Sequence, residues 1–299
     1  SKITPILKDL LLAYVLMGQG DEVNANLIFD KTAKVQGMGY FANFHRAMAQ
    51  LSASKFDSAK ETFDLIHNDQ ANPTRRSVIY HAKILIFQEQ FNEAYNLIEK
   101  WFGPTYDPEI DELLSNINGK KVYPKNSFPK INIAVADVFH SIANLISKEA
   151  DPTFTLIYSR LAQYLDDTHV DSTLMTAELL VELGQHKLAI REHEKLSKSQ
   201  PQFFASELGR AEALRSSGKE MEAIEVLAEL TAQYPNSASG FTTLGNHYRR
   251  LESYDQAETA YGKAIQIYEA DGEAGWFLYY VRGITRERLD LWSLAEKDF

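Results

Sequence analysis

The chain has 299 residues, of which 44% are hydrophobic, and it contains no cysteine. This composition allows a continuous core and excludes disulfide bonds, thiolate metal sites and cysteine nucleophiles. The sequence contains no run of about 18 uncharged apolar residues, so no membrane span is predicted. Residues 1–150 carry 16 basic and 17 acidic side chains, whereas residues 151–299 carry 15 and 24, and such an acidic half disfavours nucleic acid and anionic membranes as partners.

Pairs of small residues recur twelve positions apart along the whole chain. They are Ala13/Ala25, Ala47/Ala59, Ala82/Ala94, Ala177/Ala189, Ala211/Ala223, Gly245/Ala257 and Gly283/Ala295. The second members are separated by 34, 35, 95, 34, 34 and 38 residues. The gap of 95 leaves room for one further repeat, with Ala143 and Thr155 as a degenerate pair, and an insertion. We therefore expect repeated pairs of helices, each pair touching closely at its small residues.

Residues 1–102 form the first three predicted pairs, and residues 103–132 depart from the period. Thr74 is a plausible N-cap for the third pair. In the departing segment, Asp107 and Pro108 read as a cap and a first helical position, so we expect a short helix over about 108–116. The basic stretch that follows, Asn118 to Lys130, predicts little apolar burial and high mobility. It is either an insertion on an outer face or a lid over a groove.

Residues 133–299 form predicted repeats four to eight, the last of them truncated. Pro201 and Pro235 lie 34 residues apart, each where the second helix of a repeat should end. The spacing then grows by four residues, which predicts a longer second helix in repeat seven. Because Ser1 starts in the lead-in to a helix and Phe299 stops inside one, we expect the sequence to be a fragment of a longer array.

The stretch from Ala238 to Ala264 carries the clearest family signature. Its order is a bulky residue (Phe241), Leu244-Gly245, Tyr248, Ala257, an aromatic (Tyr261) and Ala264, and it resembles the tetratricopeptide repeat of about 34 residues. The resemblance implies an all-α fold, a right-handed superhelical solenoid of about eight antiparallel helix pairs, in one continuous array. It also implies that the first helix of each pair, here called helix A, lines a concave groove.

No catalytic or metal-binding pattern stands out. The eight histidines include no H-E-x-x-H motif, and His186 and His193, surrounded by basic residues, are expected to be solvated rather than metal ligands. There is no G-x-S-x-G, Walker or dinucleotide motif. We therefore expect a non-enzymatic protein without cofactor or metal.

The candidate binding site is the groove surface implied by the resemblance. Its apolar part is Tyr14, Phe41, Phe44 and Met48, and its charged and polar part is Glu178, Glu212, Arg215, Asn246, Arg249 and Arg250. The apolar residues could equally be core, because an amphipathic stripe normally marks packing.

The leading functional hypothesis is a scaffold that binds a protein or peptide segment in this groove. The alternatives are a regulatory repeat region of a larger enzyme and a self-associating structural subunit. The stretch from Gly275 to Phe299, together with E-L-G-R-A-E-A-L-R, resembles large alphaproteobacterial repeat proteins of the cell envelope. That resemblance favours the bacterial periplasm or envelope, with the cytoplasm possible.

Overall fold

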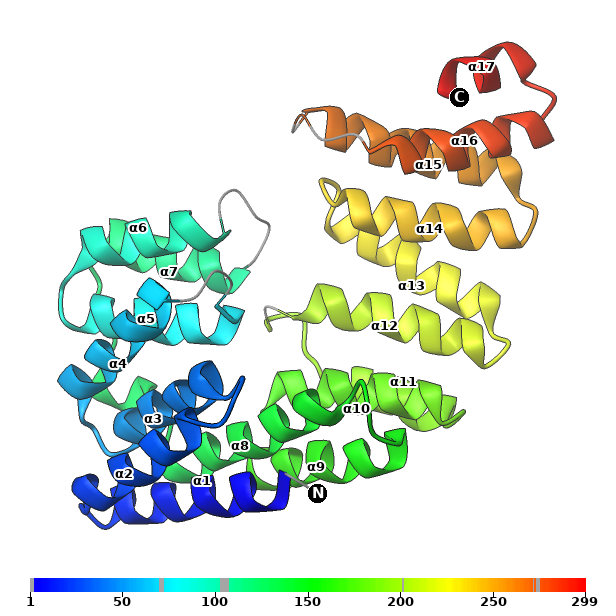
Figure 1. Cartoon of the computed structure of the whole chain (residues 1–299). Coiled ribbons are helices and arrows are strands. Elements are labelled where there is room, and N and C mark those ends of the chain that lie inside the picture. Colours follow the sequence, from blue (N-terminus) through cyan, green and yellow to red (C-terminus); the bar gives the residue numbers. More distant parts are fainter. Residues whose placement is uncertain (1–2, 70–72, 103–107, 201, 271, 273–274) are drawn as a thin grey trace. The chain divides into compact units, whose positions relative to one another are not determined.

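The molecule is helical wherever its structure is described. The computed structural model describes residues 3–69, 73–102, 108–200, 202–270, 272 and 275–299, and these residues form α-helices and one short 3₁₀ helix without a strand (Figure 1). The predicted all-α class is therefore confirmed. Internal contacts divide the chain into two compact units, unit 1 (Ser1–Thr173) and unit 2 (Leu174–Phe299).

The described residues of unit 1 form four helix pairs, one additional helix and the start of α10 (Val170–Glu182). The pairs are α1 (Ile3–Gly18) with α2 (Glu22–Ala33), α3 (Gly39–Ser52) with α4 (Phe56–Asp69), α5 (Arg75–Phe87) with α6 (Phe91–Phe102), and α8 (Ile131–Ile146) with α9 (Pro152–Leu165). The additional helix, α7 (Pro108–Asn118), precedes the 3₁₀ turn η1 (Lys125–Ser127). The predicted N-cap at Thr74 is confirmed, because its side chain accepts a hydrogen bond from the backbone N–H of Ser77.

Unit 2 continues the alternation of helices A and B. The helices are α10 (Val170–Glu182), which crosses the boundary between the units, α11 (His186–His193), α12 (Phe203–Ser216), α13 (Glu220–Gln233), α14 (Ala238–Arg250), α15 (Tyr254–Ala270), α16 (Trp276–Arg288) and α17 (Trp292–Asp298). At 17 residues, α15 is the lengthened second helix that the spacing predicts. Asp107 and Pro201, the predicted cap and helix end, lie outside the described residues.

The small residues lie where the helices of each pair touch. Ala13, Ala25 and their counterparts in the later repeats are all buried. In the seventh pair, a Cβ atom added to Gly245 would stand 2.8 Å from the Tyr261 ring of the facing helix. The degenerate pair behaves alike, since Ala143 and Thr155 are both fully buried between α8 and α9. The spacing therefore identifies the helix contacts correctly.

Two described parts of the segment between the third and fourth pairs, α7 and Phe128, are packed. The predicted short helix is α7, which adds Ile110, Leu113 and Ile117 to a core with α5 and α6. Beyond it, Phe128 is only 7% exposed, and its ring packs against those of Phe56 and Phe87, with centroids 4.9 and 5.4 Å away. The expectation of little apolar burial over Asn118 to Lys130 is wrong at Phe128, because its ring joins a cluster of three aromatic rings, whereas residues 118–122 and 124–127 are exposed.

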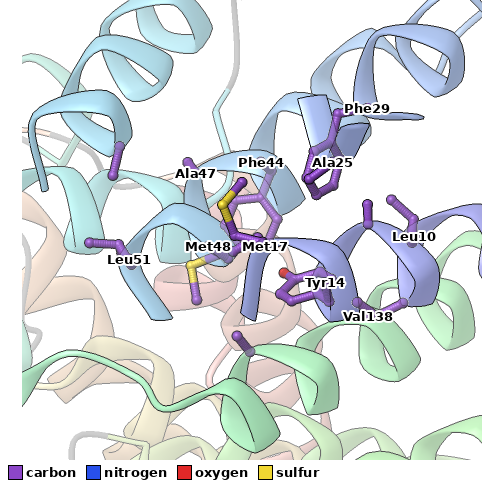
Figure 2. Packing of buried hydrophobic residues seen from close by; sticks show 14 of the residues in the cluster. Leu10, Tyr14, Met17, Ala25, Phe29, Phe44, Ala47, Met48, Leu51 and Val138 are labelled. Carbon is purple, nitrogen blue, oxygen red and sulfur yellow. The ribbon is translucent and has the colours of Figure 1, made fainter. Parts of the chain in front are cut away.

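Helix α8 packs against α1 and α3 as well as against its partner α9. Its Ala134, Val138 and Ile142 join one core cluster with residues of the first two repeats, and Figure 2 shows Val138 beside Tyr14 in that cluster. These contacts explain why unit 1 includes α8 and α9, which lie beyond the boundary between residues 132 and 133 that was predicted from the sequence.

Candidate functional site

Three of the four predicted apolar groove residues belong to the core of unit 1. Tyr14 is 1% exposed, Phe44 is 6% exposed and Met48 is fully buried. All three share a cluster with residues of α8 (Figure 2). The prediction that they point into an open groove is therefore wrong, because the chain's own α8 covers this side of α1 and α3.

The fourth apolar residue, Phe41, is half-buried at the edge of the same cluster. Its ring meets that of His45 edge-on, with centroids 4.8 Å apart. His45 itself is fully buried and lies 3.2 Å through Nδ1 from the Tyr14 hydroxyl. Burial lowers the pKa of His45 to about 4, so its imidazole is neutral at pH 7.

A buried ion-pair network fixes α8 to the other helices of unit 1. Asp137 of α8, 1% exposed, meets the Nε atom of Arg76 at 2.8 Å and the Nε2 atom of His169 at 3.1 Å. Arg76 also donates to Asp171 over 3.0 Å. Burial alone would raise the pKa of Asp137, but Arg76 and His169 bring it below its usual value. The carboxylate is thus ionised and holds α5 and the start of α10 to α8.

The sequence analysis did not predict this network or the burial of most histidines, and its expectation for His193 is wrong. His45, His67, His81, His169, His193 and His247 are all buried. His193, expected to be solvated, packs against Gly209 and lies 3.1 Å through Nδ1 from the Ser206 hydroxyl. His67 and His81 pair through their Nδ1 atoms at 2.7 Å. A signal was available for His193, which lies four residues after Ala189, as the buried Phe29, Phe63 and Ile98 lie four after Ala25, Ala59 and Ala94.

The charged part of the predicted site lies at the surface of unit 2. Glu212 and Arg215 form an ion pair on α12, and on α14 Arg250 is exposed while Asn246 and Arg249 are half-buried. The hydrogen bond from Arg215, then its charge and that of Arg250, lower the pKa of Glu212. A Cβ atom added to Gly240 of α14 would stand 3.5 Å from the Phe204 ring of α12, so these two helices are neighbours. We use the name helix-A face of unit 2 for the predicted polar residues of α10, α12 and α14, namely Glu178, Glu182, Glu212, Arg215, Asn246, Arg249 and Arg250.

The α10 end of this face is acidic. Glu178 and Glu182 stand one turn apart on α10, and neither forms an ion pair within the part of the chain that the structure describes. Partial shielding from water, and then the like charge of Glu182, raise the pKa of Glu178. The predicted residues are therefore acidic on α10 and basic or polar on α14.

Tyr261 of α15 forms hydrogen bonds with two polar side chains of α14. The Tyr261 hydroxyl donates to Asn246 Oδ1 over 2.7 Å and accepts from Arg249 Nε over 3.3 Å. Burial raises the pKa of Tyr261, so the phenol keeps its proton and the hydrogen bond to Asn246.

Within the described residues, no group of three or more histidine, aspartate or glutamate side chains is arranged to hold a metal ion. None of the described helices has the length and apolar character needed to cross a bilayer.

One family model matches part of the chain. Residues 179–288 match the family model described as the Psidin N-terminal TPR (tetratricopeptide) repeats region. No curated protein matches the chain.

Several solved structures resemble the chain at low sequence identity. MamA from Desulfovibrio magneticus RS-1 is 20% identical, with 55% of this chain and 90% of that chain covered and a TM-score of 0.45. YrrB, a TPR protein described as having an unusual peptide-binding site, is 19% identical, with 70% and 93% covered and a TM-score of 0.38. The C-terminal part of a TPR protein from Cytophaga hutchinsonii is 15% identical, with 85% and 93% covered and a TM-score of 0.46.

Proposed function

We propose that this tetratricopeptide-repeat protein is a non-enzymatic scaffold that binds a protein or peptide segment on the helix-A face of unit 2. One contrast carries the proposal. In unit 1 the predicted groove residues Tyr14, Phe44 and Met48 are covered by the chain's own α8, whereas in unit 2 the predicted residues reach the surface. A partner can therefore contact only the second set directly.

The character of this face favours an extended segment or a helix as the ligand. Stacked repeats present a long, continuous surface rather than a closed pocket, and such surfaces suit peptides better than small molecules. The charges change sign from Glu178 to Arg249 along the face, so they should orient a charged partner and speed its encounter more than they add affinity. Arg249→Glu should accordingly change the association rate and its salt dependence.

Site-directed photo-crosslinking in a lysate of the source cells tests the proposal. In one variant a photo-crosslinking residue replaces Thr242 on α14, one turn before Asn246. In a matched variant it replaces the exposed Thr259 on α15, the second helix of the same repeat. We expect a discrete crosslinked protein from position 242 and none from position 259. Equal crosslinking at both positions, or crosslinking at 259 alone, would place the partner elsewhere and end the proposal.

A further inference from the structure

The outer side of α9 is an uncharged stripe of large apolar side chains. Its members are exposed by 44%, 52%, 39% and 87%, and they are Phe154, Ile157, Leu161 and Tyr164. They follow one another by three, four and three residues, so they lie along one side of the helix. Single apolar side chains are common on protein surfaces, whereas a continuous stripe marks a place that another molecule covers. We call these four residues the α9 stripe.

The other side of α9 already forms part of the core of unit 1. Thr155, Ser159 and Ala162 are fully buried, and the helix packs along α8. The Ser159 hydroxyl also donates to the carbonyl oxygen of Ser172 over 2.9 Å. The α9 stripe is therefore a second apolar side, in addition to the one that packs inside the molecule.

Within the described residues, α9 differs in this respect from the second helices of the other pairs. Each of those helices exposes at least one charged side chain, and they are α2, α4, α6, α11, α13, α15 and α17. On α9 the exposed residues are Thr153 and the four of the stripe. Its one charged residue, Arg160, is half-buried and donates to Gln163 over 3.0 Å. The α9 stripe is thus an uncharged surface on a chain whose net charge is −10.

The α9 stripe reads the same in both directions along the helix. Because its spacings are three, four and three, a second α9 laid antiparallel across it brings Phe154 opposite Tyr164 of the second copy. The same two-fold arrangement brings Ile157 opposite Leu161 of the second copy. In a two-fold interface the same surface meets itself, so any charge on it faces a like charge. An uncharged stripe allows an acidic chain to meet its own copy without that repulsion.

We infer that two copies of the chain associate through the α9 stripe, with the two α9 helices antiparallel. The inference goes beyond the proposed function, since the stripe lies in unit 1 and the proposed binding face in unit 2. Two short helices bury less than the roughly 1,600 Å² of a standard interface, so we expect a dissociation constant on the order of 10 μM.

A lipid surface suits this stripe less well than a second copy does. Helices that lie in a membrane interface carry Lys and Arg beside their apolar side, which attract anionic headgroups. α9 is instead preceded by Asp151 and followed by Asp166 and Asp167, which anionic headgroups repel.

Sedimentation equilibrium of the full chain tests the association, at protein concentrations from about 1 to about 200 μM, which bracket the expected dissociation constant. Ile157→Asp should raise that constant at least about tenfold, because it places a carboxylate at the centre of the interface. Leu65→Asp, on the outer side of α4, is the matched control and should leave the constant unchanged. The two side chains are 52% and 51% exposed, so neither substitution disturbs the core.

The antiparallel arrangement is tested by disulfide formation, since the chain has no cysteine of its own. Phe154→Cys and Tyr164→Cys are mixed and oxidised, with a longer affinity tag on one variant to separate the products on a non-reducing gel. The mixed disulfide should form at least about tenfold faster than either homodimer. Positions 154 and 164 of opposite copies meet in this arrangement, whereas two copies of position 154 stand about 15 Å apart, beyond the reach of a disulfide.

A parent that stays monomeric over the whole concentration range would overturn the inference, and its binding to phosphatidylglycerol vesicles would then assign the stripe to a lipid surface. Equal weakening by Ile157→Asp and Leu65→Asp would place the contact outside α9. Homodimers that form as fast as the mixed disulfide would overturn the antiparallel arrangement. Crosslinking at position 242 tests the scaffold proposal separately from all of these results.

Discussion

At the residue scale, the close contact between paired helices depends on positions that cannot hold a larger side chain. Gly245 is the clearest example, because an added Cβ atom would stand 2.8 Å from the Tyr261 ring, which is itself fully buried. A ring enclosed on all sides cannot move away without disturbing its neighbours. The glycine is therefore required by the packing and not by backbone conformation.

We expect Gly245→Ala to lower the free energy of unfolding by about 1–3 kcal/mol through overpacking. Gly262, on α15 of the same pair, is the matched control, because an added Cβ atom there meets nothing within 4 Å. Gly262→Ala should be neutral or stabilise by up to about 1 kcal/mol, as alanine favours the helix. Urea unfolding of both variants gives the comparison. Equal effects would show that the Gly245 contact is not tight.

Phe44, predicted from sequence as a binding residue, belongs to the core. Its ring is 6% exposed and packs in the cluster that α8 completes (Figure 2). Phe44→Ala should therefore lower the free energy of unfolding by about 3–5 kcal/mol, because it removes buried apolar area and leaves a cavity. The measurement is chemical denaturation of parent and variant. A decrease in the free energy of unfolding below about 1 kcal/mol would indicate that Phe44 is exposed and not part of the core.

At the element scale, α8 has two roles, as the first helix of the fourth pair and as the cover of α1 and α3. The Arg76–Asp137–His169 network holds it there from the side of α5 and α10. Removing one member of a buried ion pair leaves an uncompensated charge, which costs more than the pair itself contributes.

Asp137→Ala should thus lower the free energy of unfolding by about 3 kcal/mol or more. Glu222→Ala is the control. Its ion pair with Lys219 is exposed, with side-chain exposures of 52% and 47%, and such pairs contribute at most about 1 kcal/mol. Thermal or urea unfolding distinguishes the two. If Asp137→Ala proves as mild as Glu222→Ala, α8 is held by apolar contacts alone.

The sequence predicts the helix pairs well, because each depends on local features. The small residues twelve apart, the cap at Thr74 and the short helix from Pro108 all report on neighbours close in the chain. What the sequence could not predict depends on contacts between distant residues. Neither the burial of Tyr14 in a cluster with Val138 nor the pairing of Arg76 with Asp171, 95 residues apart, follows from a repeat period. The periodic pattern marks an apolar stripe and leaves open whether the chain or a partner covers it.

At the scale of the whole molecule, buried neutral histidines make stability depend on pH. Burial lowers the pKa of His45, His81, His140 and His193 to about 4, and that of His67 to about 3. In the unfolded chain a histidine titrates near 6.5, so between these values the unfolded state binds more protons. Their contribution is complete above about pH 6.5 and is lost as the pH falls towards 4.

The free energy of unfolding should therefore fall between pH 7.5 and pH 5, by an amount on the order of 1 kcal/mol per buried histidine. The midpoint of urea unfolding should fall with it. Between pH 7 and pH 8 it should be nearly constant, because these groups are neutral in both states. A midpoint that is unchanged at pH 5 would mean that the imidazoles are not buried as described.

The central claim is that α8 covers Tyr14, Phe44 and Met48 of the first repeats, whereas the predicted binding residues of unit 2 reach the surface. The cysteine-free sequence allows a direct measurement with single cysteines, Met48→Cys in unit 1 and Asn246→Cys in unit 2, treated with a maleimide under native conditions. Far-ultraviolet circular dichroism of both variants confirms that they are folded. We predict rapid labelling at position 246 and labelling at least about a hundredfold slower at position 48, which reacts only through opening of the structure. Equal labelling rates in the two folded variants would contradict the account.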